Sequence, residues 1–88
     1  MEQKIKQQLT NRLHRIKGQV EGLERMVEAE KYCPDVIVQS LSVTESLKSF
    51  NATMLENHIR EHVSHQMKEG KTDKAVEELI KIYKLNSK

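Results

Sequence analysis

The sequence predicts an all-α domain of three helices that self-associates. Apolar residues recur at alternating spacings of four and three, the heptad pattern of helices that pack along one another. Among the three glycines and the single proline, Gly70 and Pro34 divide this pattern into three segments. A chain of 88 residues is the size of one small domain, so residues 1–88 are expected to act together.

The first helix is expected over about residues 3–30, where the heptad seam is longest. Pro34 marks the break that follows, because proline disfavours a helical conformation at the preceding Cys33 and suits the first turn of a new helix. Most charged residues fall off the seam, which consists of Leu9, Leu13, Ile16, Val20, Leu23 and Val27.

The second helix is expected over about residues 34–66 and the third over about 73–85. Gly70 separates them, and Thr72 or Asp73 is a suitable cap for the third. Rods of this length expose more apolar surface than one chain buries, so at least a dimer is expected. The second helix has two adjacent stripes: Val36, Ser40, Val43, Leu47, Phe50 and Met54, then Leu41, Leu55, Ile59, Val63 and Met67.

The composition argues against several classes of protein. A single cysteine excludes an internal disulfide and is typical of a reducing compartment. The N-terminal residues contain no signal peptide, and no run approaches the roughly 18 apolar residues of a membrane span, so a cytoplasmic protein without membrane association is expected. No nucleophile–base pair or phosphate loop is recognisable and His14 stands alone, so we expect no enzyme and no small organic substrate.

The stretch NHIREHVSH at residues 57–65 contains His58, His62 and His65. On a helix, His58 and His62 share a face and form a good chelating pair, although surface histidine pairs are also common. Cys33 lies about 37 Å from His58 along a straight helix, but antiparallel helices across a dimer axis would bring them together. Thiolate with imidazole suits Cu(I), Zn(II), Co(II) or Ni(II), and the soft thiolate favours Cu(I); the alternative for Cys33 is a structural thiol.

Charge is unevenly distributed despite a formal net charge of only +2. Residues 1–20 contain one acidic residue, Glu2, and five basic residues, Lys4, Lys6, Arg12, Arg15 and Lys17. A basic segment of this kind can bind an anionic polymer, and the alternative is an ordinary solvated helix face.

The segment RLHRIKGQVEGLERMVEAEKYCPDVIVQSLSV resembles the hallmark of the copper-sensing repressors of the CsoR/RcnR family. The similarity includes the R-x-x-R-I-x-G-Q-V-x-G-L run, the Tyr32–Cys33 dipeptide and a histidine 25 residues after that cysteine. It implies a metal-sensing, DNA-binding domain whose three-helix protomers form an antiparallel four-helix-bundle dimer and a dimer-of-dimers tetramer. It also implies repression at operator DNA in the metal-free form and release on metal loading, which derepresses copper efflux and homeostasis genes.

The resemblance implies one Cu(I) per protomer, bridging two protomers through Cys33, His58 and His62. His62 stands where many copper sensors have cysteine. The nickel/cobalt branch also uses Cys-His-His but adds an N-terminal histidine that Met1-Glu2-Gln3 lacks. A Ni(II), Co(II) or Zn(II) sensor and a non-sensing helical oligomerisation module therefore remain the alternatives. Tyr32 and Glu78 match residues that support His58 through its second ring nitrogen, whereas His65 matches no ligand.

No familiar DNA-binding motif is recognisable in the sequence. The expectation of contacts to DNA therefore rests on the basic segment and on the resemblance. Such contacts would be mainly to phosphate, so binding would depend strongly on salt. Arg12, Arg15 and Lys17 match the family's basic residues in the first helix, Gln19 lies beside them, and Lys48 is a candidate from the second helix.

Overall fold

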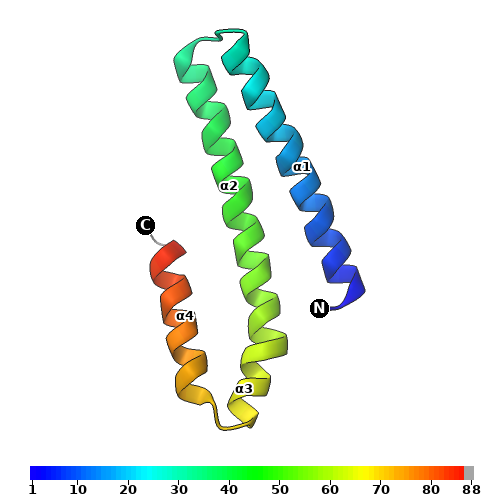
Figure 1. Ribbon diagram of the computed structural model, residues 1–88, viewed down its shortest axis with the longest axis vertical. Helices are drawn as coiled ribbons and strands as arrows, with labels where there is room; N and C mark the ends of the chain where they lie inside the picture. Colours follow the sequence, from blue (N-terminus) through cyan, green and yellow to red (C-terminus); the bar gives the residue numbers. More distant parts are fainter. Residues whose placement is uncertain (87–88) are drawn as a thin grey trace. The chain divides into compact units, whose positions relative to one another are not determined.

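The computed structural model describes residues 1–86, all of them in helices or short connections (Figure 1). The predicted all-α fold is confirmed, and no strand occurs in the described part of the chain. The second predicted helix corresponds to three consecutive segments, α2, η1 and α3. The elements are α1 (Gln3–Glu28), α2 (Cys33–His58), η1 (Ile59–Val63), α3 (Ser64–Lys68) and α4 (Thr72–Asn86).

The chain divides into two compact units, Met1–Thr53 and Met54–Lys88, with the division inside α2. The first unit contains α1 and most of α2, and the second contains the end of α2 together with η1, α3 and α4. Among the described residues, no helix is both long and apolar enough to cross a membrane.

The turn between α1 and α2 follows from Glu30, which adopts a left-handed conformation with φ of 52°. The amides of Glu30 and Lys31 donate to Val27 and Met26, so carbonyls at the end of α1 are satisfied. Helix α1 therefore ends at Glu28, slightly before the predicted boundary.

Helix α2 starts at Cys33, one residue before the predicted boundary at Pro34. The carbonyl of Tyr32 accepts hydrogen bonds from the amides of Asp35 and Val36, at 3.0 and 3.3 Å. Asp35 lies in the first turn, where its negative charge interacts favourably with the helix dipole. The lone thiol is thus the first residue of a long helix.

The core of the first unit uses only half of the predicted α1 seam. Leu9 and Ile16 are buried, whereas Leu13, Val20 and Val27 are 43%, 49% and 63% exposed. One neighbouring helix covers a single narrow face of α1, so alternate members of the seam point away from it. We name Leu13, Val20 and Val27 the outer stripe.

In the second unit Val63 of η1 and Ala75 of α4 are buried, and α3 contacts both η1 and α4. Gly70 ends α3 as predicted, with φ of +79°, a conformation that glycine adopts without steric cost. Thr72 and Asp73 lie inside the first turn of α4 rather than before it, so the prediction that one of them caps this helix is wrong. Asp73 instead favours the helix dipole.

The prediction of an unbroken α-helix through residue 66 is wrong at Ile59–Val63, which forms a π-helical turn. A π-turn adds a residue to the local repeat and rotates the following side chains relative to a continuous α-helix. His65, which follows this turn, is exposed, and Gln66 is half-buried. The side-chain oxygen of Gln66 is buried without a hydrogen-bond partner.

Candidate metal centre and DNA-facing surface

His58 is the last residue of α2, and its side chain is 31% exposed. Its Nε2 atom lies 3.7 Å from Oε2 of Glu78 in α4. This distance fits a charge interaction but is longer than a hydrogen bond. The structure therefore brings Glu78 to the ring that it is predicted to support, on the Nε2 side.

His62 lies in η1 next to His58, and the two ring centroids are 5.4 Å apart with the planes tilted by 35°. Its Nε2 atom is 3.9 Å from the carboxylate of Glu61. The side chain of His62 is largely exposed, unlike that of His58. The two histidine rings therefore remain adjacent despite the π-turn. The His58 ring lies beside α4, and the His62 ring faces solvent.

The third histidine of NHIREHVSH is engaged elsewhere. His65 Nε2 lies 3.0 Å from the carboxylate of Glu69, one turn further along, and Lys71 approaches the same carboxylate at 3.5 Å. His65 therefore has a partner, Glu69, other than the two neighbouring histidines.

Cys33 is exposed and belongs to the first unit, whereas His58 and His62 belong to the second. Tyr32, predicted to support His58, is also exposed in the first unit. Across residues 1–86, no group of three His, Cys, Asp or Glu side chains is arranged to hold a metal ion.

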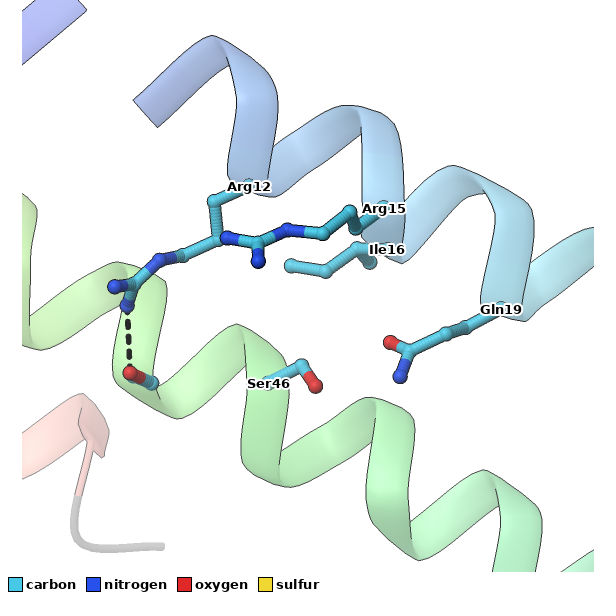
Figure 2. Close-up of a pocket in the computed structure, with 6 residues that line it drawn as sticks. Arg12, Arg15, Ile16, Gln19 and Ser46 are labelled. Atoms are coloured by element: carbon cyan, nitrogen blue, oxygen red, sulfur yellow. Dashed lines mark hydrogen bonds between the residues drawn. The ribbon is translucent and has the colours of Figure 1, made fainter. Parts of the chain in front are cut away.

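Arg12, Arg15 and Gln19, three of the predicted DNA-contacting residues of α1, line a pocket of about 260 Å³ between α1 and α2 (Figure 2). Arg12 Nη1 donates a hydrogen bond to Ser49 Oγ at 2.6 Å, drawn as the dashed line. We name this feature the α1–α2 pocket; it is lined by Arg12, Arg15, Ile16, Gln19, Ser46 and Ser49.

Two of the predicted contact residues, Lys17 and Lys48, do not line the α1–α2 pocket. Both are exposed, and the Nζ atom of Lys48 lies 3.8 Å from a carboxylate oxygen of Glu45. The structure thus gathers Arg12, Arg15 and Gln19 at one place and leaves the lysines outside it.

Two serines of α2 that line the pocket, Ser46 and Ser49, were not predicted from the sequence. Ser46 and Ser49 are three apart and so share a helix face. A detectable signal exists on α1, where Arg12 and Gln19 are seven residues apart and half-buried. Polar residues at a heptad interval, within an otherwise apolar face, indicate a polar contact between the two helices.

An all-helical chain with an exposed thiol, a histidine pair and an arginine-lined surface has the features of a metal-dependent DNA-binding regulator. Residues 5–84 match the family model described as metal-sensitive transcriptional repressor. The chain belongs to that family, which comprises regulators rather than enzymes, and its members act on DNA.

Individual relatives agree with this assignment. The copper-sensing transcriptional repressor CsoR of Bacillus subtilis is 41% identical over 81 residues, which cover 92% of this chain and 80% of the relative. The crystal structure of the copper-sensing repressor CsoR with Cu(I) from Geobacillus thermodenitrificans superposes with a TM-score of 0.91 at 31% identity, over 100% of this chain and 92% of the other. The nickel-responsive transcriptional regulator InrS gives 0.76 at 30% identity, over 91% and 90%.

Proposed function

We propose that this chain is a Cu(I)-responsive repressor that binds operator DNA without metal and releases it when Cu(I) occupies Cys33, His58 and His62. The observation that carries this proposal is the histidine pair at the end of α2, with Glu78 of α4 beside one ring. The copper-sensing relatives support Cu(I) as the first choice of effector. Residues 1–88 would act as one metal-sensing and DNA-binding domain.

The proposed ligands belong to two protomers. Cys33 and His58 are the first and last residues of α2, and a helix of that length spans about 37 Å between them. Antiparallel packing of two such helices in a homodimer would place each thiol near the partner's histidines, twice by symmetry. One Cu(I) per protomer would then bridge two protomers, and two dimers would form the proposed homotetramer.

The chemistry of the donors fits Cu(I). A thiolate is a soft ligand, and a set of one sulfur and two imidazoles suits a metal of low coordination number. Glu78 lies 3.7 Å from Nε2 of His58, where it would help to orient the ring that is proposed to hold the metal. Ni(II), Co(II) and Zn(II) accept the same donors, and Ni(II) and Zn(II) are the competing effectors in the test below.

DNA binding is proposed to use Arg12, Arg15, Lys17, Gln19 and Lys48. The convergence of Arg12, Arg15 and Gln19 at the α1–α2 pocket supports this surface. A tetramer would repeat it four times, which would strengthen a modest patch through multivalent binding. A protein that binds operator DNA acts in the compartment that contains the DNA, so we propose that it is cytoplasmic.

The test is a DNA-binding titration with the complete chain under anaerobic conditions. Affinity for the promoter region of the protein's own gene is measured by fluorescence anisotropy, without metal and with Cu(I), Zn(II) or Ni(II). Cu(I) is expected to weaken binding by about 5- to 150-fold, the usual range of an allosteric coupling. A response to Ni(II) alone would transfer the proposal to a nickel sensor, and no response to any metal would favour the non-sensing oligomerisation module.

Replacing Glu78 with alanine is expected to separate metal binding from release. The variant keeps the three proposed ligands, so Cu(I) affinity should fall by about 10- to 100-fold, as for other residues that support a ligand. Even at saturating Cu(I), the variant should release DNA less completely than the wild type, because α4 no longer interacts with the metal-loaded histidine. Chelator competition and DNA anisotropy measure the two effects, with Glu77→Ala on the same helix as the matched control; equal release by both variants would contradict the role of Glu78.

A further inference from the structure

Arg12 and Arg15 differ in how they are held at the α1–α2 pocket. Arg12 is half-buried, and its guanidinium donates to Ser49 Oγ at 2.6 Å. Arg15 is exposed, and both side chains line the same hollow (Figure 2). A flexible arginine loses side-chain entropy when it binds an anion, so one that is already held in place binds at lower entropic cost.

Ser46 and Ser49 line the same pocket but differ in their hydrogen bonds. Ser46 Oγ donates to the carbonyl of Ser42 at 3.1 Å, a bond within its own helix. Ser49 Oγ accepts from Arg12, which uses a lone pair and leaves its hydroxyl proton for another acceptor. Of these two serines, Ser49 therefore links the two helices and keeps a hydroxyl proton available at the pocket that Arg12 also lines.

We propose that Ser49 is a positioning residue, which holds Arg12 so that Arg12, Arg15 and the Ser49 hydroxyl converge on one phosphate of the DNA backbone. The inference rests on the proposed DNA binding and adds a residue from α2 to it. Guanidinium groups and a hydroxyl are matched donors for phosphate oxygens, and such charge-assisted hydrogen bonds are the strong ones.

The first test compares Ser49→Ala with Ser46→Ala in the metal-free protein. The Ser49→Ala variant is expected to bind promoter DNA about tenfold more weakly, the effect of one charge-assisted hydrogen bond, while Ser46→Ala stays within about twofold. Ser49→Thr should restore binding because it keeps the hydroxyl. Helix content and thermal unfolding by circular dichroism should match across the variants; equal DNA affinity of both alanine variants would overturn the proposal.

The second test locates the phosphate by a double-mutant cycle. Single neutral methylphosphonate linkages are scanned along the DNA and measured with wild type and with Ser49→Ala. A methylphosphonate at the position whose phosphate occupies the pocket should weaken DNA binding by the wild type. The same substitution should change the DNA affinity of Ser49→Ala by at most twofold. Strict additivity at every linkage would overturn the assignment to a backbone phosphate.

A third arm separates DNA phosphate from free phosphate. Chloride is exchanged for inorganic phosphate at constant ionic strength, and DNA affinity is measured for the wild type and Ser49→Ala. Equal affinities in both salts are expected for each protein. Specific competition by phosphate in wild type alone would assign the pocket to a free anion and overturn the proposal. Failure of wild type to bind DNA at all would overturn the proposed function, whereas normal wild-type binding with no effect of Ser49→Ala would overturn this inference alone.

Discussion

Replacing Cys33 with alanine is expected to abolish the release of DNA by Cu(I) while metal-free DNA binding remains. The thiolate is the one soft donor in the proposed set, and two imidazoles alone would not join the two protomers across the dimer. Because Cys33 is exposed, its loss creates no cavity and should leave the fold unchanged. The whole coupling, about 5- to 150-fold in DNA affinity, should disappear in the anisotropy titration.

The matched control is His65→Ala. His65 belongs to the same histidine-rich stretch but is paired with Glu69, so its removal should preserve the Cu(I) response. Retention of the response in Cys33→Ala would contradict the proposed ligand set. Loss of the response in His65→Ala would show that the third histidine contributes to sensing.

Replacing Val20 with glutamate is expected to dissociate the oligomer. Val20 is the central member of the outer stripe and is 49% exposed in the single chain, so the substitution costs little there. In a dimer that covers this stripe, each copy would bury an unpaired carboxylate, at a cost of several kcal/mol per ion. Symmetry doubles the penalty, and DNA binding and the Cu(I) response should be lost together.

Analytical ultracentrifugation measures this loss directly, with Gln8→Glu as the control. Gln8 is an exposed polar residue of α1 on a different face from the outer stripe, so its substitution should preserve the assembly. Wild type should show an unfolding temperature that rises with protein concentration, as expected for a stabilising association. An unchanged oligomer in Val20→Glu would place the interface on another face of the chain.

The sequence predicts the helices well because their signals are local. Pro34 and Gly70 act through backbone geometry at their own positions, and both breaks occur within a few residues of the predicted places. The π-turn at Ile59–Val63 has no comparable signal, since no glycine, proline or change of apolar spacing marks it in the sequence. The split of the α1 seam also escaped prediction, because a heptad pattern does not state how many neighbours the helix has.

The candidate site shows the same division. Helical spacing alone pairs His58 with His62, and the structure confirms that their rings are adjacent. The link between Arg12 and Ser49 joins residues 37 positions apart, a separation at which no periodicity relates two side chains.

By itself, the sequence determined an all-helical chain, its breaks and the donors available for a metal, because helix propensity, proline and glycine geometry and side-chain chemistry are properties of residues and their near neighbours. Only the tertiary structure decided which seam residues face inward and that Ser49 holds Arg12. Those contacts depend on the packing of separate helices, and their physical basis is the burial and hydrogen bonding that packing creates.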